Sequence, residues 1–157
     1  MKKKVKRIMV DMSATLIHHG HIRILKAAKE LGTVIVALTT DEEIISKKGF
    51  EPELNFAERR EILEAIKYVD DVVPSPWLLD ESFLDLHNID LLVHGHDNQN
   101  PIGPERLLIL SRTKGISSGL LCSRVLKSVA AIMAAAEEPS QDDPKLERHL
   151  EPQIIGQ

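Results

Sequence analysis

Several residue types are scarce in this chain, and each scarcity narrows the possible functions. Cys122 is the single cysteine, which excludes an intramolecular disulfide and is typical of a reducing cytoplasm. Aromatic residues make up only 3% of the chain, which argues against an aromatic cage for a quaternary ammonium group. The net charge is −4, so there is no basic excess of the kind that indicates nucleic-acid binding.

Long apolar runs are also missing from the linear sequence. The N-terminal apolar run is short and ends at Asp11, so we expect neither a signal peptide nor a membrane span. We therefore expect a cytoplasmic protein. A content of 43% hydrophobic and 28% charged residues over 157 residues is typical of one globular domain. We predict a domain over residues 1–136 and a weakly ordered tail over residues 137–157, which is rich in Pro, Gln and acidic residues.

Short apolar runs alternate with segments of helical spacing. The strand-like runs are residues 5–10, 33–38, 69–73, 89–93 and 107–110. Thr40, Asn55 and Asp80 are suitable N-caps for helices between them. This order predicts an α/β, Rossmann-like fold, with a five-stranded parallel sheet and helices on both faces.

The loop after the first predicted strand carries His18-x-Gly20-His21, and helical spacing begins directly after it. Two imidazoles at a helix start can bind one anion together with the free N–H groups of the first turn. Gly20 has no side chain, so a ligand could approach the backbone closely. The alternative interpretation is two solvated histidines in a surface loop.

Polar side chains also follow the strands predicted at residues 89–93 and 107–110. The carboxyl ends of parallel strands meet at one edge of a sheet, so we expect these segments to form a single site. Nearly all of the collected groups donate hydrogen bonds: His18, His21, Lys48, Arg59, Arg112, Ser13, Ser117 and Ser118. Such a set suits phosphoryl or nucleotidyl transfer, which depends on positioning and charge stabilisation.

Other interpretations of these residues stay open at this point. Lys48 could be a solvated loop lysine, Arg59 a surface arginine paired with a glutamate, and Trp77 a packing residue. His94 and His96 could join the first two histidines around zinc, but no cysteine or carboxylate cluster completes such a site, so we predict no protein-bound metal.

The segment Arg112-Thr113-Lys114-Gly115-Ile116-Ser117 resembles a motif of the cytidylyltransferases that act on phosphocholine, phosphoethanolamine and glycerol 3-phosphate. The resemblance extends over about residues 5–131. It includes the His-x-Gly-His sequence, Lys48-Gly49-Phe50, Glu58-Arg59, Tyr68-Val69-Asp70, Pro76-Trp77 and His94-Gly95-His96-Asp97. The resemblance implies CTP as nucleotide, Mg²⁺ as cofactor, a homodimer, and a small phosphorylated or phosphonate acceptor.

The resemblance also assigns roles to residues. It implies four catalytic residues, His18, His21, Lys48 and Arg112. The acceptor would be bound by Lys48, Arg59, Trp77 and His94. The nucleotide would be bound by Met12, Ser13, Asp97, Thr113, Gly115, Ile116, Ser117 and Ser118.

Several residues depart from the family's pattern. Met12, Thr15 and Gly119 stand where the family usually has Gly, Asp, and Ser or Thr, and His96 interrupts what is often an Asp-Asp pair. The acceptor could therefore differ from choline or ethanolamine phosphate, for example a phosphonate or another phosphoalcohol. Two alternatives remain: an adenylyltransferase of the same superfamily that uses ATP, and a nucleotide-binding module without catalysis.

Overall fold

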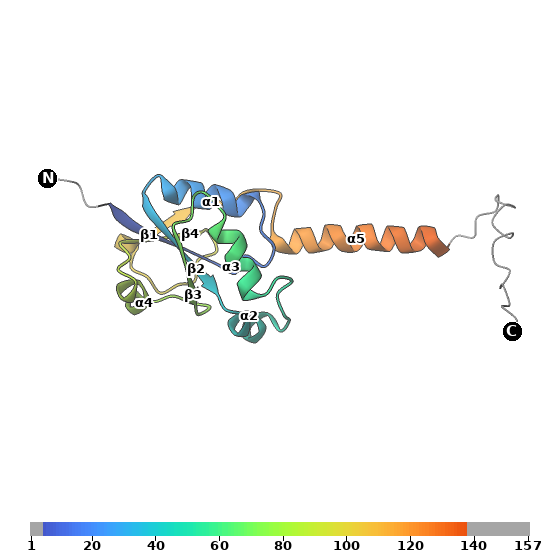
Figure 1. Cartoon of the computed structure of the whole chain (residues 1–157), viewed down its shortest axis with the longest axis horizontal. Coiled ribbons are helices and arrows are strands. Elements are labelled where there is room, and N and C mark those ends of the chain that lie inside the picture. The colour runs from blue at the N-terminus through green and yellow to red at the C-terminus, as the bar shows by residue number, and fades with distance from the viewer. Residues whose placement is uncertain (1–4, 138–157) are drawn as a thin grey trace, which may run out of the picture. The chain divides into compact units, whose positions relative to one another are not determined.

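The computed structural model describes residues 5–137 and contains one five-stranded parallel sheet (Figure 1). Its strands lie in the order β3-β2-β1-β4-β5. They are β1 (Lys6–Met12), β2 (Gly32–Thr39), β3 (Asp71–Ser75), β4 (Leu91–Gly95) and β5 (Leu107–Leu110). The α/β, Rossmann-like fold predicted from the alternating pattern is confirmed.

Helices cover both faces of the sheet. They are α1 (His19–Lys29), α2 (Asp41–Lys48), α3 (Phe56–Glu64), α4 (Glu81–Leu86) and α5 (Ser118–Glu137), with a 3-10 turn η1 (Pro104–Arg106). Leu25 of α1 and Leu63 of α3 pack with Ile8 and Val10 on one face. Leu84 of α4 packs with Met9 on the other face. Successive residues of β1 thus enter opposite cores, because strand side chains alternate between faces.

Two strands start later than the apolar pattern predicted. β3 begins at Asp71 rather than 69, and β4 begins at Leu91 rather than 89. Asp70 precedes the ladder because its carboxylate accepts the Val34 N–H at 2.7 Å and binds Lys29 Nζ at 2.6 Å. Pro74 fits inside β3 because β3 is an edge strand, where the missing N–H faces no neighbour.

The strand order also defines where a ligand should bind. β1 lies at the centre of the sheet, with β2 on one side and β4 on the other. The strand order therefore reverses at β1: β2 and β3 extend the sheet to one side, and β4 and β5 extend it to the other. In open parallel sheets the crevice at such a reversal, at the carboxyl ends of the strands, is the usual ligand site. The His18 loop after β1 and the His94 segment of β4 meet there.

The chain divides into two compact units, Met1–Leu121 and Cys122–Gln157, and α5 begins in the first and continues into the second. The stretch Ser118–Ala136 is long and apolar enough to cross a membrane by length and composition alone. Arg124 and Lys127 interrupt this stretch, so the expectation that no uninterrupted apolar run is long enough to span a membrane is not contradicted. The tail predicted after residue 137 lies outside the described residues.

Candidate functional site

A cavity of about 950 Å³ lies at the carboxyl ends of β1, β4 and β5. All four residues predicted to be catalytic line it, together with most of those predicted to bind the nucleotide. These lining residues are His18, His21, Lys48, Arg112, Ser13, Asp97, Thr113, Ile116, Ser117 and Ser118. Two predicted nucleotide residues lie elsewhere: Met12 lines an adjoining cavity, and Gly115 lines a shallower one of about 660 Å³.

The two histidines of the first loop are locked together at the start of α1. His18 is the N-cap residue, and its Nδ1 accepts the Gly20 N–H at 3.1 Å. His21 Nδ1 accepts the His18 N–H at 3.2 Å, which completes a reciprocal capping box. Since both Nδ1 atoms act as acceptors, the neutral rings carry their protons on Nε2, where each can donate to a bound anion.

The same geometry keeps the imidazoles neutral. Burial lowers the pKa of His21 to about 4, and the nearby His18 adds to this effect. Burial also lowers the pKa of His18, with further contributions from the charges of His19 and Arg112. The ring centroids are 4.0 Å apart, so two positive charges there would repel strongly. The pair is therefore a set of two uncharged Nε2–H donors.

The segment before α5 forms the opposite wall of the large cavity. Ser117 Oγ accepts the Leu120 N–H at 3.1 Å and so caps the first turn of α5. The Ser118 hydroxyl donates to the Leu16 carbonyl at 3.2 Å, which fixes this helix start against the first loop. The start of α5 and two basic side chains, Arg112 and Lys114, thus line the same cavity as the two histidines.

A second cavity of about 480 Å³ adjoins the first and shares Ser13, His21, Lys48 and Asp97 with it. Trp77 and His94, both predicted to bind the acceptor, line this second cavity. Lys48 Nζ lies 5.7 Å from the Trp77 ring centroid, within the range of a cation–π contact. Lys48 is therefore placed at the border between the two cavities.

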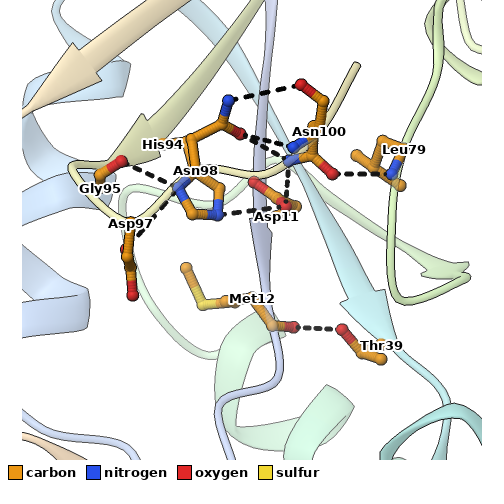
Figure 2. Close-up of polar contacts among 9 residues, drawn as sticks. All are labelled: Asp11, Met12, Thr39, Leu79, His94, Gly95, Asp97, Asn98 and Asn100. Carbon is orange, nitrogen blue, oxygen red and sulfur yellow. Dashed lines mark hydrogen bonds and ion pairs between the residues drawn. The ribbon is translucent and has the colours of Figure 1, made fainter. Parts of the chain in front are cut away.

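Asp11, at the end of β1, is the centre of a polar network in the second cavity (Figure 2). Its Oδ2 accepts from Asn100 Nδ2 at 2.9 Å and lies 3.4 Å from His94 Nε2. Asn100 is held in turn, because its Oδ1 accepts the Leu79 N–H at 2.8 Å. The other carboxylate oxygen, Asp11 Oδ1, is buried and has no hydrogen-bond partner within residues 5–137. The residue itself is part of the lining of the second cavity.

The protonation of this network follows from its contacts. His94 Nδ1 lies 3.0 Å from the Gly95 carbonyl oxygen, which only accepts, so Nδ1 carries a proton. Burial raises the pKa of Asp11, while His94 and the Asn100 hydrogen bond lower it. A donor from a ligand would favour the ionised carboxylate.

Arg59 lines none of the three cavities, so its contact with the acceptor stays a prediction that the site geometry does not support. Its side chain is 0% exposed. One guanidinium nitrogen donates to the Ser13 carbonyl, and Nη2 binds Asp41 Oδ1 at 2.6 Å. Arg59 instead holds the first loop, in which Ala14 adopts a left-handed φ of 48°.

Asp11 and Asn100 were missed by the sequence reasoning. Asp11 directly follows a buried apolar run, and a carboxylate at the end of a central strand was a usable signal. Asn100 gave no comparable signal, because it lies in a turn-rich loop and approaches Asp11 only in the folded chain.

Metal binding by protein groups alone finds no support within residues 5–137. No group of three or more His, Cys, Asp or Glu residues is placed to hold an ion there. The histidines suggested as zinc ligands therefore do not form a metal-binding cluster in this part of the chain. Asp97 supplies the carboxylate in the lining of the large cavity. An ion held mainly by substrate phosphates fits such a sparse set, since Mg²⁺ usually needs only one or two carboxylates.

Relatives with known names match the chain over most of its length. The ethanolamine-phosphate cytidylyltransferase of Dictyostelium discoideum is 36% identical over 138 residues, which cover 79% of this chain and 38% of that protein. The glycerol-3-phosphate cytidylyltransferase of Staphylococcus aureus is 35% identical over 122 residues, which cover 73% of this chain and 90% of that protein. The chain thus spans well under half the length of the ethanolamine-phosphate relatives, but nearly all of the bacterial one.

Two further similarities are more limited. FAD synthase of Pyrococcus horikoshii is 44% identical over 68 residues, 43% of this chain and 46% of that protein. The lipopolysaccharide core biosynthesis protein of Thermoplasma volcanium has the same fold, with a TM-score of 0.54, 20% identity, and coverage of 80% of this chain and 89% of that one. Residues 13–121 match the Cytidylyltransferase-like family, and together with the bacterial relative this match shows that the chain belongs to that family.

Proposed function

We propose that the chain transfers CMP from CTP to a small phosphoalcohol or phosphonate, releasing pyrophosphate and forming a CDP-linked product. One observation carries the proposal. The neutral His18 and His21 donors and the Arg112 to Ser118 segment, which come from opposite ends of the domain, line one cavity large enough for a nucleotide. A second cavity with its own polar groups adjoins it, as a two-substrate reaction requires.

The reaction needs little from the protein beyond positioning and charge stabilisation. An acceptor phosphate oxygen attacks the α-phosphorus of CTP, and the bond from that phosphorus to the bridging oxygen of pyrophosphate breaks. The Nε2–H groups of His18 and His21 donate to the α-phosphate oxygens and stabilise the charge that develops there. Arg112 and Lys114 neutralise the leaving pyrophosphate, and Lys48, at the border of the cavities, neutralises the attacking phosphate.

A magnesium ion belongs to the proposal through the family. Bound to the triphosphate, it would offset negative charge on the leaving pyrophosphate. Asp97 lines the cavity and is the residue that could contribute a ligand to it. We place the protein in the cytoplasm, in which CTP is available and Cys122 stays reduced.

The second cavity supports an acceptor that carries a hydrogen-bond donor or a positive charge. Asp11 Oδ1 is buried without a partner among the described residues, and such an acceptor atom is costly unless a ligand or water satisfies it. An ammonium or hydroxyl group would do so. Ethanolamine phosphate and glycerol 3-phosphate, the substrates named for the relatives, carry such groups. Trp77 is the one aromatic residue in this lining, which does not favour a quaternary ammonium group.

The decisive experiment measures pyrophosphate release with CTP, Mg²⁺ and a panel of acceptors: ethanolamine phosphate, glycerol 3-phosphate and 2-aminoethylphosphonate. We expect turnover with at least one acceptor, and its loss in a His21→Ala variant. His19→Ala is the matched control, because His19 is exposed and lines none of the three cavities. A folded protein that binds CTP but turns over no acceptor would instead support a nucleotide-binding module.

One finding favours a second candidate, an adenylyltransferase that uses ATP. The FAD synthase relative has the highest identity of those described, although it matches less than half of the chain. Thermal unfolding with CTP or ATP separates the two, since a ligand at 100 times its Kd stabilises the folded state by about 2.7 kcal/mol. A larger rise in Tm with ATP than with CTP would overturn the assignment of CTP.

A further inference from the structure

Basic side chains gather around the large cavity of about 950 Å³. Arg23, Lys48, Arg112 and Lys114 line it, and they form no ion pair or side-chain hydrogen bond with any group in residues 5–137. Asp97 supplies the carboxylate in the same lining. Like charges that gather without partners repel one another, and the chain as a whole has a net charge of −4. This local excess of positive charge indicates a site for a ligand with several negative charges.

Arg23 is the basic residue of this lining to which neither the sequence motifs nor the proposed reaction gives a role. It lies on α1, two residues after His21, and it is exposed. Ile24 and Ala27 of the same helix also line the large cavity, so the cavity continues along α1 beyond the two histidines. An exposed arginine at the edge of a cavity can keep its guanidinium hydrated and still reach a bound anion, because its stem is long.

The linings of the two adjoining cavities indicate which part of the nucleotide Arg23 can reach. Lys48 and Asp97 line both cavities, whereas Arg23, Arg112 and Lys114 line the large cavity and not the second one. In the proposed reaction the acceptor occupies the second cavity, so its oxygen attacks from that side. The leaving oxygen lies roughly in line with the attacking one, on the opposite side of the phosphorus. The leaving pyrophosphate should therefore lie among the three basic residues that do not line the second cavity.

We propose that Arg23 binds the β- and γ-phosphates of the nucleotide and stabilises them as they leave as pyrophosphate. The inference rests on the proposed function, because it needs a nucleoside triphosphate in the large cavity. Arg112 and Lys114 belong to the segment before α5, and Arg23 belongs to α1, so two separate elements would hold the leaving group. The planar guanidinium can donate two parallel hydrogen bonds to phosphate oxygens, which the single ammonium group of a lysine does not match.

The affinities of the full-length protein for CTP and CMP test this inference without any need for turnover. Titration calorimetry in the presence of Mg²⁺ should show that Arg23→Ala raises the Kd for CTP about tenfold or more. The Kd for CMP should stay nearly constant, because CMP lacks the two phosphates that Arg23 would bind. Arg23→Lys should restore part of the affinity for CTP. Lys26→Ala is the matched control, because Lys26 is an exposed basic residue of α1 that lines none of the three cavities.

Product inhibition gives a second measurement. In the turnover assay, Arg23→Ala should raise the inhibition constant of pyrophosphate about tenfold or more and leave KM for the acceptor nearly unchanged. A rise in KM for the acceptor as large as that for CTP would mean that Arg23 only supports the shape of the site, and it would overturn the inference.

The possible results separate this inference from the proposed function. If Arg23→Ala binds CTP as tightly as wild type, or loses CTP and CMP affinity equally, the inference is overturned and the proposed reaction stands. If wild type binds CTP through Arg23 but turns over no acceptor, the reaction is overturned and the phosphate contact stands. ATP and AMP are titrated in the same way, so that an adenylyltransferase is tested equally. A wild-type protein that binds neither triphosphate would overturn both proposals.

Discussion

The rings of His18 and His21 both cap backbone N–H groups at the start of α1: the ring of His21 accepts the N–H of His18, and the ring of His18 accepts that of Gly20. The helix cap and the anion site are therefore the same two side chains. Their Nδ1 atoms hold the backbone, and their Nε2 atoms remain for a ligand. This double use explains why substitutions here must be chosen to separate stability from catalysis.

The first prediction separates the two roles at His18. We expect His18→Asn to keep the helix cap, since asparagine is a favoured N-cap residue, but to lose the Nε2–H donor. Turnover should fall about 100- to 1,000-fold, the usual cost of removing one donor to a developing charge. Steady-state kinetics and urea unfolding check it together. A fall in activity that merely tracks lost stability would contradict the assigned role.

The second prediction concerns Gly20. A Cβ at this position would lie 2.8 Å from both Nδ1 and Cε1 of His18, closer than real contacts allow. Gly20→Ala should therefore push the His18 ring off the cap and raise KM for CTP as well as lower kcat. Gly119→Ala is the comparison, because a Cβ added at Gly119 would have no other atom within 4 Å among the described residues. Its kinetic constants should change much less.

The third prediction is a loss of stability in mild acid. The pKa of His21 is lowered to about 4 in the folded chain, against about 6.5 in the unfolded chain, so the unfolded state binds more protons between these values. The contribution of the buried, neutral His21 to the free energy of unfolding is fully present above pH 6.5 and is lost as the pH falls toward 4. Between pH 7 and pH 5 we expect a loss of about 2 kcal/mol from this residue. Urea unfolding of wild type and His21→Gln should show a shallower pH dependence in the variant.

The fourth prediction concerns Arg59, which acts by positioning. Removing it with Arg59→Ala leaves Asp41 without its partner and frees the Ser13 carbonyl, so unfolding should become easier by about 3–5 kcal/mol. Arg60→Ala is the matched control: Arg60 is exposed and pairs with Glu64 along the helix, so its removal should cost far less stability. Comparable losses for the two variants would show that the buried contacts of Arg59 are unimportant.

The fifth prediction concerns the acceptor. Asp11→Asn removes the charge but keeps the shape, so KM for an acceptor with an ammonium group should rise at least about tenfold. KM for CTP should stay nearly constant, because Asp11 lines the second cavity and not the first. Equal changes in both KM values would mean that Asp11 only supports the fold.

Local sequence patterns predicted much of this structure. β5 was predicted with its observed bounds, and β2 to within one residue at each end. β1 ends two residues later than predicted, and β3 and β4 begin two residues later, where the Asp70 and Asp90 side chains accept backbone N–H groups before the ladder begins. Those contacts join residues 36 and 83 positions apart, so no local pattern could reveal them.

By itself the sequence determined the alternation of strands and helices and the presence of phosphate-binding groups after them, because side-chain periodicity and cap residues act over a few neighbours. Only the tertiary structure decided which groups face a ligand. It buried Arg59 away from the cavities and joined Asn100 to Asp11. These outcomes depend on contacts between segments that are far apart in the sequence, and local sequence patterns carry no information about such contacts.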